Sequence, residues 1–208
     1  MIFFFFLALF SVEASYPPSW WVLEKNSQLK TWERLPNQVK APKLVVSLHS
    51  PLRVLHPLGS KPFSYGGKRY QSIESFWQSM KFPSHEEDPR HTGSRLKYTR
   101  EQVMKLSASK ARLAGIEAGE KMKRMGINWV SFDSLTFPYR ENKRGQHYQL
   151  IFMAYLQMLD QNPGVKKLLI ETKGLKLVSD TAIEKELPPA WKFWEILMAI
   201  RDQKLMTP

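Results

Sequence analysis

The sequence of 208 residues contains no cysteine. A disulfide framework, a thiolate nucleophile and a cysteine-bound zinc site are therefore all excluded. The chain also lacks the glycine-rich motif GxGxxG, the P-loop motif, the zinc motif HExxH and the nucleophile motif GxSxG. Nothing in it points to a dinucleotide-dependent oxidoreductase, a P-loop kinase or a zinc protease. A hydrolase that needs neither a metal nor an organic cofactor is the simplest enzyme compatible with these absences.

Basic residues are in excess, because 31 Lys and Arg residues stand against 19 Asp and Glu residues and give a formal net charge of +12. Such an excess favours anionic partners, which include phosphorylated small molecules, nucleic acid and anionic membrane surfaces. A solvated basic surface is the alternative explanation. The basic residues are spread along the chain and no named nucleic-acid module is present, so a nucleic-acid partner has no further support.

An apolar run, MIFFFFLALF, opens the chain, and the small residues Val12 and Ala14 follow it before Ser15. This pattern is typical of a signal peptide and is too short to span a bilayer as a mature helix. The run has no basic residue in front of it, so translated upstream sequence is the alternative. We expect residues 1–14 to be either a cleaved signal peptide of a secreted protein or a mis-assigned start of a cytoplasmic one.

The rest of the chain is long enough for one domain with a sizeable core. We divide it into an N-terminal arm at residues 15–42, rich in tryptophan and proline, and a domain at residues 43–205. Apolar patterns and capping signals predict the following elements. They are strands at Lys43–Leu48, Arg53–Leu55 and Leu175–Val178, helices at Gln146–Leu159, Pro163–Glu171 and Ala190–Lys204, and a loop or irregular strand at Ser131–Gly145.

Between these elements, the residues Thr99-Arg100-Glu101-Gln102 form a capping box that predicts a helix start. Further along, Gly115 suits the C′ position of a helix that begins near Ser107. A charged helical segment then continues from Glu117 to Arg124. The polar stretch Ser84–Lys97 carries histidines and carboxylates, but their spacing matches no metal-ligand motif, and we interpret it as a solvated loop.

The most informative stretch is PFSYGGKRYQSIESFWQSMKFP, from Pro62 to Pro83. The Gly66-Gly67 pair between two short aromatic runs predicts a β-hairpin, because glycine reaches the positive φ that primed turns need. Ser72 can then cap a helix. The apolar residues of that helix recur at i, i+3, i+4 and i+7, and three polar residues occupy an adjoining face. These polar residues are Glu74, Gln78 and Lys81.

This stretch resembles the signature of the NADAR family, also called YbiA-like. In that family a D/G-G-K-x-Y hairpin runs into a helix of the form S/T-V/I-E-x-F/Y/W-x-Q-x-x-K-F/Y, which here reads Ser72-Ile73-Glu74 to Met80-Lys81-Phe82. Weaker similarities extend the match from Arg53 to Arg201. They include the Ser107–Gly115 element, the Ile127-Asn128-Trp129 segment and the closing Leu197–Arg201 segment.

The resemblance implies an α+β fold: a mostly helical single domain with a small sheet and a hairpin. It also implies a hydrolase that cleaves the N-glycosidic bond of a phosphorylated ribosyl compound. The substrate would be a riboflavin-pathway intermediate or an ADP-ribosylated base, and neither a cofactor nor a metal is implied. Glu74 and Asp180 are the predicted catalytic carboxylates. The predicted substrate-binding residues are Trp77, Gln78, Lys81, Lys110, Trp129 and His147.

Several residues have a second interpretation that the sequence leaves open. Glu74 in a first helical turn can stabilise an oxocarbenium-like transition state, or it can simply complement the helix dipole. Trp129 can stack on a base or fill the core. His147 can act as a general acid or base, or it can pack at the start of a core helix.

The sequence departs from the family pattern at two places. Pro57 and Leu58 occupy a turn that reads S-N-F in many members, where the Asn lines the site. The D-x-x-W-G-x-G segment is replaced by Ala182–Pro189, and Asp180 is the nearest remaining acid. A non-catalytic module of the same fold that binds ADP-ribose or another nucleotide is therefore the alternative function.

Overall fold

The computed structural model describes residues 16–24, 29–93, 95–181 and 187–203. The predicted signal peptide or mis-assigned start, residues 1–14, lies outside the described residues. Six α-helices and three two-stranded sheets form the described part of the chain. The predicted α+β fold class, mostly helical with little sheet, is confirmed. Among the described residues, no helix combines the length and the apolar composition needed to cross a membrane.

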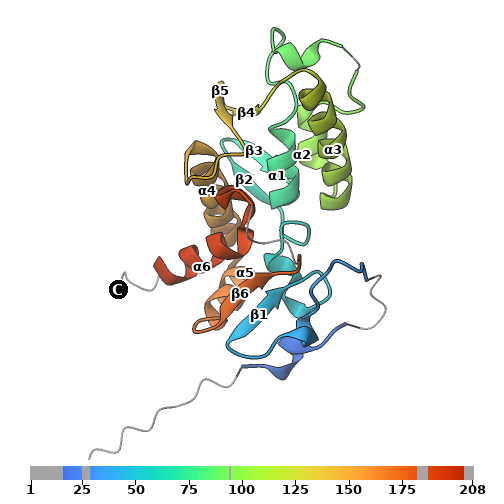
Figure 1. The fold of residues 1–208 in the computed structure, drawn as a ribbon. Helices are drawn as coiled ribbons and strands as arrows, with labels where there is room; N and C mark the ends of the chain where they lie inside the picture. Colours follow the sequence, from blue (N-terminus) through green and yellow to red (C-terminus); the bar gives the residue numbers. More distant parts are fainter. Residues whose placement is uncertain (1–15, 25–28, 94, 182–186, 204–208) are drawn as a thin grey trace, which may run out of the picture.

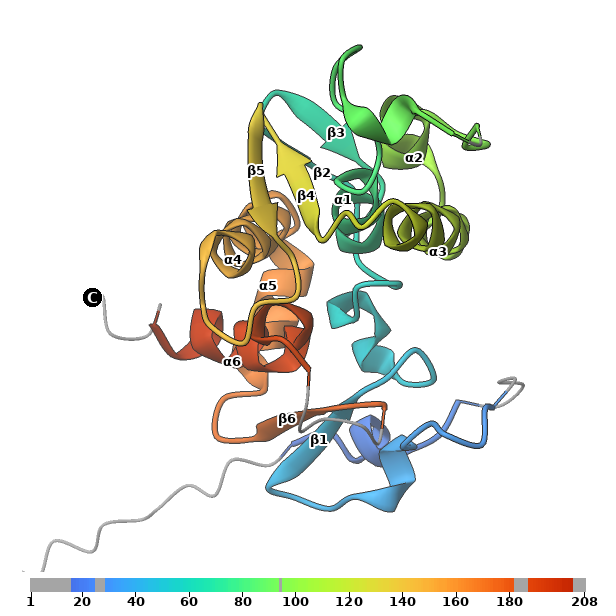
Figure 2. The same cartoon turned by 45° about the horizontal axis from the view of Figure 1, so that its top comes forward.

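A parallel pair of strands joins the two ends of the domain. Strand β1 (Lys43–Val46) pairs with β6 (Lys176–Ser179), and Leu44 lies opposite Leu177. These two leucines are fully buried, which agrees with the apolar runs that predicted both strands. Figures 1 and 2 show the two strands side by side at one end of the molecule, next to the N-terminal arm.

The N-terminal arm packs on this end through three aromatic residues. The Tyr16 hydroxyl donates to the Lys173 carbonyl at 2.6 Å, and the Trp21 Nε1–H donates to the Lys43 carbonyl at 2.9 Å. Trp20 is buried in the main core. The arm is therefore held to the sheet by hydrogen bonds as well as by apolar contact.

The strand predicted at Arg53–Leu55 is wrong, because the structure has a 3-10 helix at Pro51–Leu55. Ser50 caps this helix, since its Oγ accepts the N–H of Leu52 at 3.2 Å. Leu52 and Leu55 are both fully buried. Residues three apart lie on the same side of a 3-10 helix, so a short apolar pattern of this kind does not distinguish it from a strand.

The predicted hairpin and the helix after it are both confirmed. Strands β2 (Phe63–Tyr65) and β3 (Lys68–Tyr70) pair antiparallel, and Gly66 and Gly67 have φ values of +56° and +71°. Helix α1 (Ile73–Ser79) follows directly. It is the central helix of the fold and contacts α2, α3 and α4 as well as β3 (Figure 1).

The helix that follows the polar loop, α2 (Arg100–Lys105), begins at the predicted capping box. The Gln102 side chain accepts the N–H of Thr99 at 2.8 Å, and the Thr99 hydroxyl accepts the N–H of Gln102 at 3.3 Å. Helix α3 (Ala108–Arg124) then runs without interruption. The predicted helix end at Gly115 is therefore wrong. Gly126, with a φ of +69°, follows the actual end of this helix.

The structure contains a second hairpin that the sequence pattern does not predict. The stretch Ser131–Gly145 was expected to be a loop or an irregular strand, but β4 (Trp129–Phe132) and β5 (Leu135–Pro138) pair antiparallel. Asp133 and Ser134 form the turn with φ values of +44° and +64°. Because this turn contains no glycine, the usual sequence signal for a hairpin is missing.

The C-terminal half supplies most of the main core. Helix α4 packs against α1, α5, α6 and β2, and its Ala154, Tyr155 and Met158 are fully buried. The three helices are α4 (Gln146–Gln161), α5 (Pro163–Glu171) and α6 (Phe193–Gln203), and a 3-10 helix at Pro189–Trp191 precedes the last. All three were predicted, although α6 begins later than the expected Ala190.

A buried charge cluster holds the C-terminal end of α1. The guanidinium of Arg90 donates to both oxygens of Asp88, at 2.9 and 2.6 Å, and to the Met80 carbonyl at 2.8 Å. Arg100 donates to the carbonyls of Phe82 and Ser131 at 3.1 and 2.9 Å. The two arginines therefore tie the carbonyls that follow α1 to strand β4 and helix α2.

Asp88 is the carboxylate that hydrogen bonds to Arg90 in this cluster, and it is 2% exposed. Burial by itself would raise the pKa of Asp88. Hydrogen bonds from the Arg90 side chain and from the backbone N–H groups of Ser84 and Arg90 outweigh burial and hold the pKa well below its usual range. Asp88 therefore remains ionised in the folded protein under ordinary conditions.

We expect Asp88→Asn to lower the free energy of unfolding by about 3 kcal/mol at pH 7, because it leaves Arg90 buried without a counter-charge. The depressed pKa makes the contribution of the ion pair complete above about pH 4, and this contribution is lost as the pH falls further. The difference in free energy of unfolding between the wild type and the variant should therefore become smaller in acid. Urea unfolding at several pH values measures this difference. The control is Glu86→Gln, at an exposed position of the same loop, which should change the free energy of unfolding little. An equal loss of stability in both variants would contradict the prediction.

Candidate active site

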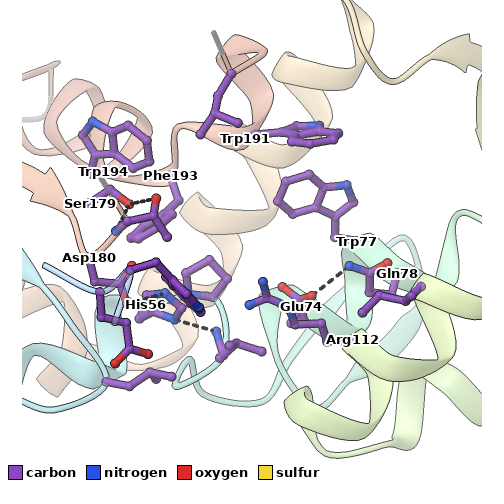
Figure 3. A pocket seen from close by; sticks show the side chains of 18 of the residues that line it. His56, Glu74, Trp77, Gln78, Arg112, Ser179, Asp180, Trp191, Phe193 and Trp194 are labelled. Atoms are coloured by element: carbon purple, nitrogen blue, oxygen red, sulfur yellow. Dashed lines mark hydrogen bonds and ion pairs between the residues drawn. The ribbon is translucent and has the colours of Figure 1, made fainter. Parts of the chain in front are cut away.

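A cavity of about 510 Å³ lies between α1 and the end of β6. Its walls come from the N-terminal arm, the turn after the 3-10 helix at Pro51–Leu55, helices α1 and α3, and the start of α6. Figure 3 shows this cavity with Glu74, Gln78 and Arg112 on one side and Asp180 and His56 on the other. The two predicted catalytic carboxylates therefore line the same cavity.

Glu74 projects from the first turn of α1 and is 6% exposed. The helix cap does not involve its side chain: the Ser72 Oγ accepts the N–H of Ser75 at 3.0 Å, and the Ser75 Oγ accepts the N–H of Ser72 at 2.9 Å. The Glu74 Oε1 instead accepts a hydrogen bond from the Gln78 Nε2 at 2.8 Å. Glu74 is therefore not the capping residue of α1, and its carboxylate lines the cavity.

Two cationic side chains, Lys81 and Arg112, line the cavity near Glu74. The Lys81 Nζ donates to the Gly115 carbonyl at 3.1 Å, and burial lowers the pKa of Lys81 to about 8. The charges of Arg140 and Arg112 lower it as well, while Glu74 acts in the opposite direction. Lys81 therefore changes its charge close to physiological pH.

Asp180 lies at the end of β6 and is 7% exposed. Its Oδ2 is 3.5 Å from the Nε2 of His56, which also lines the cavity. The His56 Nδ1 accepts the backbone N–H of Leu58 at 3.1 Å. A neutral imidazole carries one hydrogen, so this bond assigns the hydrogen to Nε2, where it faces Asp180.

Aromatic side chains form much of the remaining wall (Figure 3). The rings of Trp77 and Trp191 meet edge to face, with centroids 5.7 Å apart. The indole N–H of Trp191 donates to the Tyr139 carbonyl at 3.1 Å. Phe193 packs edge-on against His56 with centroids 4.9 Å apart. A planar, partly apolar ligand suits such a cavity.

Three of the predicted substrate-binding residues lie outside the cavity. Lys110 is exposed on the first turn of α3. Trp129 packs on Arg90, whose guanidinium carbon is 4.5 Å from the ring centroid. His147 is 2% exposed behind Trp77, and burial lowers its pKa to about 4, so it is neutral at pH 7. His147 therefore supports the indole of Trp77 as a packing residue.

The cavity also contains residues that the sequence analysis did not select, among them His56, Arg112 and Trp32. Arg112 had a signal: in the pattern S/A-x-x-x-A-K-x-x-G, which the Ser107–Gly115 element resembles, Arg112 takes the place of the Lys. Residues two apart on a helix point about 200° from one another, so Lys110 and Arg112 cannot both face the cavity. His56 and Trp32 lie in turns, and no periodic pattern marks them. Among the described residues, no group of three or more His, Asp and Glu side chains could hold a metal ion.

Gly115 explains how α1 and α3 approach so closely. A Cβ at this position would lie 1.8 Å from the Gln78 Oε1 and 2.4 Å from the Gln78 Cδ. Only glycine leaves room for the amide that binds Glu74. This contact, rather than a helix end, accounts for glycine at position 115.

We expect Gly115→Ala to displace the Gln78 side chain and to break its hydrogen bond to Glu74, so that ligand binding falls without a gain in stability. Gly119→Ala is the matched control one turn later, since its Cβ would meet only the Lys81 Nζ at 3.7 Å. That control should be neutral or more stable by up to about 1 kcal/mol. Thermal unfolding and ligand titration of both variants measure these effects. Equal stabilisation by both substitutions would contradict the close approach.

A scan against known protein families finds no match, and a search of curated proteins finds none. Among solved structures, the NMR structure of the E. coli protein YbiA is similar, with a TM-score of 0.49 and 18% sequence identity. The similarity covers 81% of this chain and 88% of that chain.

Proposed function

We propose that this chain hydrolyses the N-glycosidic bond of a phosphorylated ribosyl compound. One observation carries the proposal: two buried carboxylates, Glu74 and Asp180, line a single cavity that also contains two cations and several indoles. The proposal also draws on the resemblance of residues 72–82 to the NADAR helix. The substrate class is a riboflavin-pathway intermediate or an ADP-ribosylated base.

Cleavage of a ribosyl C–N bond passes through an oxocarbenium-like state. Glu74 stabilises the positive charge that develops on the sugar, because its carboxylate is buried and held by Gln78. The hydrogen bond from Gln78 occupies one carboxylate oxygen and leaves the other for the ligand. A carboxylate that is already oriented needs no reorganisation when the charge appears.

Asp180 serves as the base for the attacking water. The Nε2–H of His56 faces the Oδ2 of Asp180 and leaves its Oδ1 to accept a proton from water. The water oxygen bonds to the anomeric carbon as its proton passes to Asp180. The C–N bonding electrons pass to the nitrogen of the leaving heterocycle, and that nitrogen takes a proton from solvent. His56 acts through Asp180 and is a positioning residue.

Lys81 and Arg112 neutralise the phosphate of the ligand. Both line the cavity on the side of Glu74, and Lys81 reaches it from the turn that follows α1. Lysine is a point charge that tolerates different phosphate orientations, whereas arginine can bind two oxygens at once. Trp77 and Trp191 provide apolar faces for the sugar or the base.

Glu74→Gln should lower kcat by about 100-fold or more, with a smaller effect on KM, because the charge matters chiefly in the transition state. The amide is isosteric and can still accept the hydrogen bond from Gln78, so the fold should be retained. Release of ribose phosphate from candidate ribosylated substrates measures turnover. Glu120→Gln, an exposed acid on α3, is the control.

Wild-type turnover by the Glu74→Gln variant would remove Glu74 from the mechanism. Tight binding of the phosphorylated ligands by the wild type without any hydrolysis would identify the alternative function, a nucleotide-binding module of the same fold. The two outcomes are separated by measuring binding and product release on the same samples.

Lys81→Met should weaken the binding of ribose 5-phosphate by about tenfold, since it removes a charge-assisted contact. Lys110→Met is the matched control, because Lys110 is exposed outside the cavity, and it should have little effect. The pKa of Lys81 near 8 adds a pH test. Binding requires the protonated ammonium, so wild-type affinity should fall between pH 7 and pH 9 and the Lys81→Met variant should not show that fall. Calorimetric titration measures both, and a loss that is equal in the two lysine variants would contradict a phosphate contact at Lys81.

A further inference from the structure

A short stretch of the N-terminal arm forms part of the cavity wall. Trp32 and Glu33 both line it, although the resemblance to the NADAR family begins only near Arg53. The backbone of Glu33 forms an antiparallel bridge with Thr181. The next residue, Arg34, donates its N–H to the Asp180 carbonyl at 2.6 Å and its Nη1 to the Ser179 carbonyl at 3.2 Å.

The side chain of Glu33 fastens this stretch from a second direction. Its Oε2 is 3.0 Å from the His49 Nε2 and accepts the N–H of Lys30 at 3.1 Å. These two contacts hold the Glu33 side chain in the cavity wall. The arm is fixed to the same strand end that carries Asp180, so Trp32 has a defined position at the cavity.

Trp32 differs from the other tryptophans of the described arm. Trp20 is buried in the core, and Trp21 donates a hydrogen bond to Lys43. Trp32 is 52% exposed, and within the described part of the chain no other ring stacks on it. An indole at a cavity that contributes so little to packing is available for a ligand.

The charges of the cavity decide which part of a ligand lies near Trp32. The carboxylates of Glu33 and Asp180 belong to the wall formed by the arm and β6, and they repel a phosphate. The cations Lys81 and Arg112 belong to the wall formed by α1 and α3. A phosphate is therefore bound near α1 and α3, and the uncharged planar part of the ligand extends toward the arm.

We propose that Trp32 stacks on the heteroaromatic ring of the ligand and makes the arm a specificity-determining wall. This inference rests on the proposed function for the ribosyl phosphate, and it adds that the cavity selects ribose phosphates carrying a planar base over ribose phosphate alone. Stacking of a base on an aromatic side chain is tolerant of base identity. The arm therefore selects for the presence of a ring more strongly than for a particular base.

The test compares two probes that share the ribose and the phosphate and differ only in the ring, namely AMP and ribose 5-phosphate. Trp32→Ala should weaken AMP binding about tenfold and change ribose 5-phosphate binding by less than about twofold. Trp32→Phe should retain most of the affinity for AMP. Leu29→Ala is the control, since Leu29 is exposed on the same arm and does not line the cavity.

Equal losses of affinity for the two probes in Trp32→Ala would overturn the inference, because they would show that Trp32 only shapes the cavity. An unchanged affinity for AMP would also overturn it. The result does not depend on turnover. Ring-dependent binding without hydrolysis would overturn the proposed catalytic function and leave the role of Trp32 supported. Thermal unfolding of each variant verifies that the arm stays in place, and binding of neither probe by the wild type would overturn both proposals.

Discussion

The close contact between α1 and α3 at Gly115 is the constraint on which the rest of the site depends. With no Cβ at this position, the Gln78 amide fits against α3 and holds the Glu74 carboxylate, and the Gly115 carbonyl receives the Lys81 ammonium. A two-turn helix and the turn that follows it thus present an acid, an amide and a cation in fixed order. A larger residue at position 115 would disturb all three side chains at once.

The carbonyls that follow α1 are held by charge instead of by close packing. Arg90 and Arg100 bind the carbonyls that follow the helix, and Asp88 balances one of the two buried charges. A buried charge without a partner is costly, so this arrangement tolerates few alternatives. The result is a short helix whose C-terminal end is fixed both by close packing and by charge, which suits a site that must orient a carboxylate before the ligand arrives.

Much of the first half of the site could be predicted, because Glu74 and Gln78 lie on one face of α1 and the same helical spacing selects Lys81, which lies in the turn directly after the helix. The hairpin before them was equally predictable, since Gly66-Gly67 marks a turn. The second hairpin could not be predicted in this way, because Asp133 and Ser134 reach positive φ without glycine. Lys110 and Arg112 show the limit of a motif match: only the helix orientation decides which of two neighbouring cations faces the cavity.

The sequence by itself determined the local elements, the helix face with its acid and its cation, and the absence of thiol chemistry, because these depend on residue type and on spacing of a few positions. Only the tertiary structure brought Asp180 and His56 to the same cavity as Glu74 and added Trp32 from the arm. Those residues are separated by tens of positions and lie in turns or at a strand end. Their proximity depends on how β1 pairs with β6 and on how the arm crosses the end of that sheet, and neither feature leaves a periodic pattern in the sequence.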